Sequence, residues 1–148
     1  MRSSLNRVHY NFYHLFRIRY SEIDAQGIVF NAHYFTYFDT AITEFIREIN
    51  FDYKALIASE GLDFYLVKST IEYFKPAAFD QLIEVGVSIA RVGRSSITWE
   101  LAIFRKDEDE CLARGELVWV CTKLGSGKSH PLPDNLLRLI DSSGLTPG

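Results

Sequence analysis

Asp24 is the side chain with the clearest chemical potential, and it lies within residues 19–41, RYSEIDAQGIVFNAHYFTYFDTA. Gly27, three residues later, allows the backbone to approach a ligand closely or to adopt a positive φ angle. The amides at the start of a predicted helix, near Asn31 to His33, would point at the same loop. A carboxylate facing unpaired N–H groups at a helix start supplies a base or a nucleophile beside a stabiliser of an oxyanion.

The same residues also fit an ordinary turn. An aspartate side chain commonly accepts a hydrogen bond from the backbone two residues further on, and a glycine then completes such an Asx-turn. Local chemistry therefore leaves two interpretations of Asp24 and Gly27 open, one catalytic and one structural.

Hydrophobic periodicity predicts the elements that position this loop. Residues 12–20 alternate with period two, which predicts a strand before the loop. From His33 to Ile49 apolar residues recur every three or four positions, which predicts a long amphipathic helix with Asn31 as its N-cap. Asp52 would cap a second, short helix that runs through Ala58.

The rest of the chain is mostly extended. Strands are predicted over 63–75, 83–90, 96–103 and 112–122, with turns at Gly93 and over 105–110, and a last short helix over 134–140. Long strands joined by short turns pair antiparallel. The single long helix has one apolar face that a sheet must cover, so an α+β fold with the helix lying against a curled antiparallel sheet is expected.

Length and composition favour one globular domain. The 148 residues carry 47% hydrophobic and 24% charged side chains, with a net charge of −3. We expect one domain over 1–148, with a core of about 12–141 and flexible ends. The acidic balance argues against nucleic-acid binding. No apolar run is long enough to cross a membrane and no signal peptide is recognisable, which predicts a cytoplasmic protein. Two cysteines cannot form a zinc site by themselves.

The stretch YSEIDAQGIVFNAHY, from Tyr20 to Tyr34, resembles the signature of the 4-hydroxybenzoyl-CoA thioesterase family of hotdog-fold proteins. It is especially similar to the acyl-CoA thioesterase branch that includes the Tol-Pal-associated enzymes. The resemblance continues through EYFKPA (72–77), VGRSS (92–96) and the PLP that begins at Pro131, and it covers most of residues 13–137.

The resemblance implies a hotdog fold, a long helix wrapped by an antiparallel sheet, with active sites at a dimer interface. Asp24 matches the catalytic carboxylate, which attacks the thioester or activates a water. The Asn31 backbone amide matches the donor to the thioester oxygen, and Tyr20 matches a tyrosine that borders the site. The implied reaction hydrolyses acyl-CoA to free acid and CoA without metal or organic cofactor.

Further residues are candidates for binding the substrate, because relatives place the same regions near CoA, whose phosphates favour cations and backbone donors. Besides Gly27, the candidates are Lys75, Arg91, Arg94, Ser95 and Ser96. A solvated turn is the alternative interpretation of each. Many relatives have histidine at the position of Asn31 and asparagine at the position of His33, whereas this chain has them exchanged. His33 is therefore a candidate for substrate binding, for a contact with the partner chain or for an ordinary surface histidine.

Two other functions stay open. A hotdog hydratase or dehydratase would use His33 with an acid, and a non-catalytic module would bind acyl-CoA or an acyl-carrier protein without turnover. Asp24 favours the thioesterase, since a pure binder gains nothing from a carboxylate beside a thioester. Acyl-carrier protein also remains a possible substrate carrier. Hydrophobic stripes on a one-helix domain predict a homodimer that extends the sheet, or a homotetramer.

Overall fold

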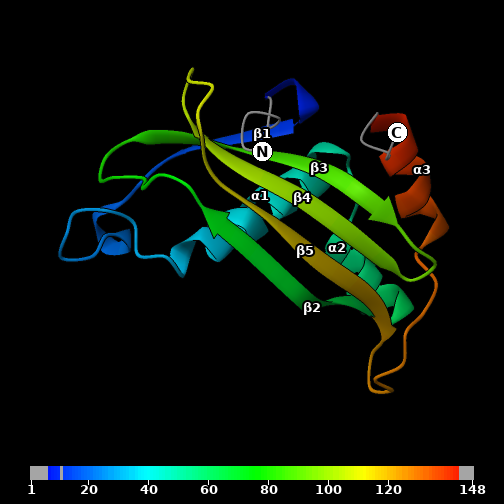
Figure 1. Cartoon of the computed structure of the whole chain (residues 1–148). Helices are drawn as coiled ribbons and strands as arrows, with labels where there is room; N and C mark the ends of the chain where they lie inside the picture. Colours follow the sequence, from blue (N-terminus) through cyan, green and yellow to red (C-terminus); the bar gives the residue numbers. More distant parts are fainter. Residues whose placement is uncertain (1–6, 11, 144–148) are drawn as a thin grey trace.

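The structure is a computed structural model that describes residues 7–10 and 12–143. A five-stranded antiparallel sheet curves around one long helix (Figure 1). The strand order is β1-β3-β4-β5-β2. The strands are β1 (Phe12–Arg17), β2 (Leu62–Tyr73), β3 (Leu82–Val92), β4 (Ser96–Arg105) and β5 (Cys111–Lys123). The helices are α1 (His33–Glu48), α2 (Tyr53–Ala55), which a π-helical turn Leu56–Glu60 continues, and α3 (Asp134–Ser143). The expected α+β fold is confirmed.

Helix α1 buries a stripe that differs from the predicted one in its first turn. The period places Phe35 on the predicted stripe, but Phe35 is only half-buried, and Tyr34 and Tyr37 are buried in that turn. Both tyrosines have hydrogen-bond partners for their hydroxyl groups, so their burial leaves no polar atom unsatisfied. Further along, Phe38 and Ile42 are fully enclosed under the sheet, as the helical period predicts.

Aromatic rings connect α1 to the centre of the sheet. Phe45 meets Trp99 edge-to-face with 5.7 Å between ring centroids, and Trp99 meets Trp119 at 5.5 Å. Such pairs stabilise a core beyond the area that they bury. Trp99 is buried, whereas Trp119, on β5, is half-buried.

Several element boundaries depart from the sequence-based expectation. The first strand ends at Arg17, because the chain then turns through the 3-10 segment Tyr20–Glu22. The N-cap of α1 is Ala32 and not Asn31, and no side chain caps it. The short second helix is capped by Asp52 as predicted, with its carboxylate accepting from the Ala55 amide at 2.9 Å, but it continues to Glu60.

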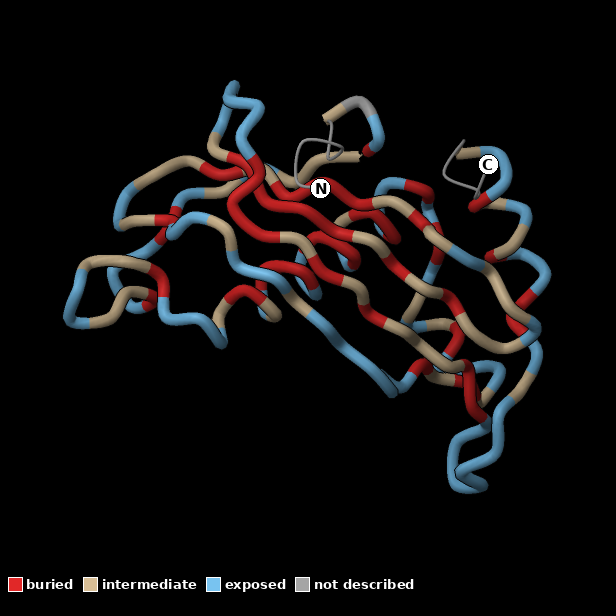
Figure 2. The backbone as a smooth tube through the Cα atoms, viewed as in Figure 1, coloured by how far each residue is buried: buried red, intermediate tan, exposed pale blue. Residues whose placement is uncertain are grey.

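Strand β2 forms one edge of the sheet and is exposed over most of its length, in contrast to the buried strands at the centre (Figure 2). Its exposed side chains include Leu66 and Val67, which are 50% and 59% accessible. A bulge between Leu66 and Lys68 interrupts its register with β5. A long apolar edge of this kind is a template for pairing with another strand.

The beginning of the described chain packs on the outer face of the sheet. Tyr10 is buried there beside Phe104 and Cys111. Tyr10 belongs to the start that was expected to be flexible, and Ser142 and Ser143, at the expected flexible end, belong to α3. Residues 1–6, 11 and 144–148 of the expected flexible ends lie outside the described residues. No helix in the described ranges is long and apolar enough to span a membrane.

Candidate active site

The Asp24 loop, residues 23–31, folds back on itself as a tight hairpin. Ile23 and Val29 form an isolated antiparallel bridge, and the Asp24 amide donates to the carbonyl of Ile28 at 2.9 Å. The Gly27 amide donates to the Asp24 carbonyl at 3.0 Å, and Gly27 has a φ angle of +78°. The left-handed conformation disfavours residues with a Cβ atom, which explains a glycine at the turn.

The Asp24 carboxylate is half-buried and makes the Asx-turn that local chemistry predicts. Its Oδ1 atom accepts a hydrogen bond from the Gln26 amide at 2.8 Å. Its Oδ2 atom accepts none from the residues that the structure describes. The two interpretations of Asp24 are therefore compatible, because one oxygen orients the carboxylate and the other is available for a ligand or a water.

The start of α1 offers backbone donors beside this loop. Within the described ranges, the Asn31 and Ala32 amides make no hydrogen bond to another residue. The Ala32 side chain cannot cap them, and the Asn31 side chain does not. Uncapped amides at a helix start bind negative charge, so this end of α1 can donate hydrogen bonds to the oxygen of a polarised carbonyl.

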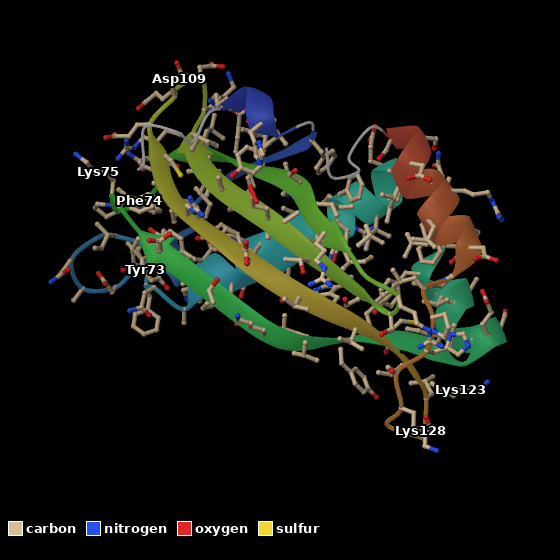
Figure 3. The ribbon with its side chains drawn as sticks, turned by 45° about the vertical axis from the view of Figure 1, so that its right-hand side comes forward. Tyr73, Phe74, Lys75, Asp109, Lys123 and Lys128 are labelled. Carbon is tan, nitrogen blue, oxygen red and sulfur yellow. The ribbon has the colours of Figure 1, made fainter. Side chains whose placement is uncertain are left out.

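A groove of about 350 Å³ opens between the loop, the start of α1 and the end of β2. Its walls come from Ile28, Val29, Asn31, Tyr34 and residues 73–76. Tyr73, Phe74 and Lys75 lie together at this end of the sheet (Figure 3). The Lys75 ammonium is 3.6 Å from a carboxylate oxygen of Glu110, and both side chains are about half exposed. Lys75 and Asn31 therefore line the same groove.

Hydrogen bonds to the segment after β2 hold the loop in place. The Val29 amide donates to the carbonyl of Ala77 at 2.8 Å, and the Ala77 amide donates to the Tyr34 hydroxyl at 3.1 Å. The Tyr73 hydroxyl donates to the Asn31 carbonyl at 3.0 Å. Tyr34 and Tyr73, whose rings meet edge-to-face at 5.1 Å, thus hold the segment after β2 and Asn31 before the helix start.

Glu22, just before the loop, is a buried carboxylate with a full set of donors. It accepts hydrogen bonds from the backbone amide and guanidinium of Arg19 and from the Tyr37 hydroxyl. Burial alone would raise the pKa of Glu22, but these hydrogen bonds outweigh it and hold the pKa below its usual value. Glu22 is therefore ionised at neutral pH.

Two candidates from the sequence lie on the surface near the loop. Tyr20 is 76% accessible and meets the ring of Phe79 edge-to-face at 5.8 Å. His33 is the first residue of α1, and its ring meets Phe30 edge-to-face at 6.2 Å. Neither side chain lines the groove. In the described part of the chain, no cluster of three or more His, Cys, Asp or Glu side chains is arranged to hold a metal ion.

Four other candidates lie at the opposite end of the sheet from Asp24. They are Arg91, Arg94, Ser95 and Ser96, at the turn between β3 and β4. The 11 residues of β3 lead from the loop's end of the sheet to this turn, which at about 3.3 Å per residue is a span of roughly 35 Å. Lys123 and Lys128 mark the same far end, away from Tyr73 and Lys75 (Figure 3). One copy of the chain does not bring the two groups together.

Sequence reasoning missed the residues that support the loop: Glu22, Tyr34, Tyr37 and Tyr73. A glutamate between a serine and an isoleucine in a polar loop reads as exposed. The available signal was Arg19 three residues earlier, the spacing at which an arginine reaches a carboxylate across a single turn.

The described geometry defines an α+β protein whose loop carboxylate stands beside the uncapped start of a central helix. A family model described as the thioesterase superfamily matches residues 26–112. The chain belongs to this superfamily and is a hotdog-fold thioester hydrolase.

Similar proteins agree with this assignment. An acyl-CoA thioester hydrolase, YbgC of Escherichia coli, is 31% identical over 82% of this chain and 89% of its own length. A putative esterase of Aquifex aeolicus is 32% identical over 84% of this chain and 93% of its own length. The crystal structure of the PA5185 protein of Pseudomonas aeruginosa has a TM-score of 0.85 and 30% identity, covering 97% of this chain and 96% of that one. These relatives support acyl-CoA thioesterase activity.

Proposed function

We propose that this protein hydrolyses an acyl-CoA thioester with Asp24 as the catalytic carboxylate and the Asn31 amide as the donor to the thioester oxygen. The observation that carries the proposal is the unbonded Oδ2 atom of Asp24, in a hairpin that leads directly into an uncapped helix start. A carboxylate and a preorganised N–H group are the two functions that attack on a thioester requires.

The reaction can follow either of two routes. As a base, Asp24 takes a proton from a water whose oxygen bonds to the carbonyl carbon. As a nucleophile, its own oxygen bonds to that carbon, and expulsion of the CoA thiolate then leaves a mixed anhydride, which water hydrolyses. In both routes negative charge develops on the thioester oxygen, which the Asn31 amide stabilises. The carbon–sulfur bond then breaks, and the CoA thiolate leaves and takes up a proton.

The groove beside Asn31 is the proposed position of the substrate near the scissile bond. Its wall combines the Tyr34 and Tyr73 rings with the Lys75 ammonium, which suits an uncharged thioester next to an anionic CoA. Gly27 keeps the loop backbone close to this position, and Tyr20 and His33 flank it from the surface. An acyl-carrier protein remains a second possible carrier of the same acyl thioester.

The working unit that we propose is a homodimer paired along the exposed edge of β2, with a homotetramer as its possible extension. A two-fold axis makes the two β2 strands antiparallel, so the far end of one sheet lies beside the Asp24 loop of the other. Arg91, Arg94, Ser95 and Ser96 of one copy would then contact the CoA bound at the other copy's Asp24. The exposed Leu66 and Val67 support this edge as the contact.

The test is thiol release from a panel of short, long and aromatic acyl-CoA esters. Asp24→Asn should reduce kcat by roughly 10²-fold or more while the fold is retained, since it removes the base or nucleophile. Asn31→Ala should have much less effect, because the backbone amide remains. Circular dichroism provides the control for folding. Wild-type turnover in Asp24→Asn would refute the mechanism, whereas tight acyl-CoA binding without turnover in the wild type would indicate a binding module.

A further inference from the structure

Glu22 connects the turn before the Asp24 loop to helix α1. The proposed reaction requires these two segments to keep a fixed position relative to each other. Its side chain is 7% accessible, while that of its ion-pair partner Arg19 is 69% accessible. One carboxylate oxygen accepts from the Arg19 amide at 2.8 Å and from the Tyr37 hydroxyl at 2.9 Å. The other accepts from the Arg19 guanidinium, with Nε at 2.9 Å. Four donors from two elements thus converge on one buried group.

The backbone of Glu22 is tied to the same loop. Its amide donates to the Arg19 carbonyl at 3.0 Å, and its carbonyl accepts from the Phe30 amide at 3.0 Å. Phe30 directly precedes Asn31, so this last bond spans the base of the hairpin that holds Asp24. The side chain meanwhile reaches α1 through Tyr37, one turn beyond the helix start.

We infer that Glu22 is the positioning residue of the site, and that its carboxylate sets the distance between Asp24 and the first amides of α1. The inference rests on the proposed function. Tyr37 donates the hydrogen bond that ties the Glu22 carboxylate, and with it the turn before the loop, to α1. Without this bond, Asp24 would be free to shift relative to Asn31. Misplacing a catalytic group by about 1 Å can cost on the order of 10²-fold in rate.

The hydrogen bonds around Glu22 fit a residue that positions the Asp24 loop better than one that only stabilises the fold. An ion pair to an arginine that is mostly in solvent contributes little by itself. A carboxylate with its four donors in place, however, has a single preferred geometry, because each donor fixes the direction of one lone pair. Tyr37 is itself fixed by packing, since its ring lies 4.6 Å from that of Phe16.

The test compares Glu22→Gln and Tyr37→Phe with matched controls. Glu22→Gln keeps the shape but loses one acceptor and the charge, and Tyr37→Phe keeps the ring and loses the donor. Glu48→Gln removes an exposed glutamate of the same helix. Tyr10→Phe removes a buried hydroxyl that has no hydrogen-bond partner in the described chain. We expect kcat to fall roughly 10–100-fold in both test variants, with KM changed by less than about threefold, and both controls to match the wild type.

Hydrogen exchange provides a second readout that does not depend on activity. Faster exchange should be confined to the amides of the Asp24 loop and the first turn of α1, while the rest of the sheet keeps its protection. If exchange increases uniformly and kcat follows the loss of folded protein, Glu22 is only a stabilising residue and the inference is wrong. Normal kcat in Glu22→Gln and Tyr37→Phe would also overturn it.

The pH dependence of kcat/KM distinguishes the role of Glu22 from that of Asp24. The groups that face Glu22 are Arg19, from its own turn, and Tyr37, from α1. Arg19→Gln removes the charge that helps to lower the pKa of Glu22, so burial raises that pKa. Protonation would then loosen the loop at a higher pH than in the wild type, and the acid limb of kcat/KM should move upward. An unmoved acid limb would contradict the inference.

If the wild type and Asp24→Asn are equally inactive, the proposed function fails, while hydrogen exchange still tests Glu22.

Discussion

At the scale of single residues, the geometry of Asp24 allows a turn-forming aspartate to serve also as the catalytic carboxylate that we propose. The hydrogen bond from Gln26 to Oδ1 fixes the carboxylate plane, and Oδ2 keeps its lone pairs for a reactant. Such orientation lowers the entropy that must be lost when the reactive geometry forms. The Asx-turn therefore provides part of the orientation that the proposed catalytic role of Asp24 requires.

Gly27 allows a test of how strongly loop conformation controls activity. Gly27→Ala should reduce the free energy of unfolding by about 1 kcal/mol, because a Cβ atom is strained at positive φ, although no atom lies within 4 Å of it. The kcat should also fall, and by more than the loss of folded protein explains, because the relaxed hairpin moves Asp24. Urea denaturation and thiol release measure the two effects.

Gly127→Ala is the matched control, since Gly127 also has a positive φ of +67° with open space around it, in a turn at the other end of the sheet. It should show the same loss of stability with unchanged kcat. Equal losses of activity in the two variants would mean that the Gly27 turn has no particular effect on Asp24.

The sequence predicted Asp24, Gly27 and Asn31 as neighbours because they are close along the chain. It did not predict Glu22 as buried, since the burial depends on Tyr37, fifteen residues away on a helix whose buried stripe was predicted correctly from Phe38 onward but not in its first turn. Periodicity alone favoured Phe35 on the buried face. Tyr34 and Tyr37 were not placed on that face, and the partners that satisfy their buried hydroxyls, Glu22 and the Ala77 amide, lie outside the helix.

At the scale of elements, α1, β2 and β5 meet so closely at Gly115 that there is no room for a side chain at this position. A Cβ atom at Gly115 of β5 would lie 2.5 Å from the carbonyl oxygen of Thr70 on β2 and 2.7 Å from the ring of Phe38 on α1. The sequence predicted the strands and the helix well because each has a strong period. The contact among Gly115, Thr70 and Phe38 joins three elements, and no periodic pattern in the sequence predicts it.

Gly115→Ala should therefore destabilise the protein by roughly 1–3 kcal/mol, through displacement of Phe38 or of the β2 backbone. The same displacement affects the helix that carries Asn31, so kcat should also fall. Thermal denaturation followed by circular dichroism measures the first effect. An unchanged melting temperature would show that α1 can slide away from the sheet without cost.

At the scale of the whole molecule, Asp24 and Arg94 lie at opposite ends of the sheet, so under the proposed function one chain would not form a complete site. The residues that resemble CoA-binding positions are well placed for function only if a second copy presents them. Sequence alone identified both groups through the family resemblance, yet it could not show that they lie at opposite ends of the sheet. That arrangement follows from the strand order and from the direction of β3.

Subunit complementation tests this division of the site. Asp24→Asn and Arg94→Glu should each be poorly active at low acyl-CoA concentration, the first through lost chemistry and the second through repulsion of phosphate. In a heterodimer, one site combines the intact Asp24 of one chain with the intact Arg94 of the other. After unfolding and refolding an equal mixture, about half of the dimers are mixed, each with one intact site, so about a quarter of wild-type activity should return. Absence of recovery, with mixed dimers confirmed by mass spectrometry, would place Arg94 outside the partner's site.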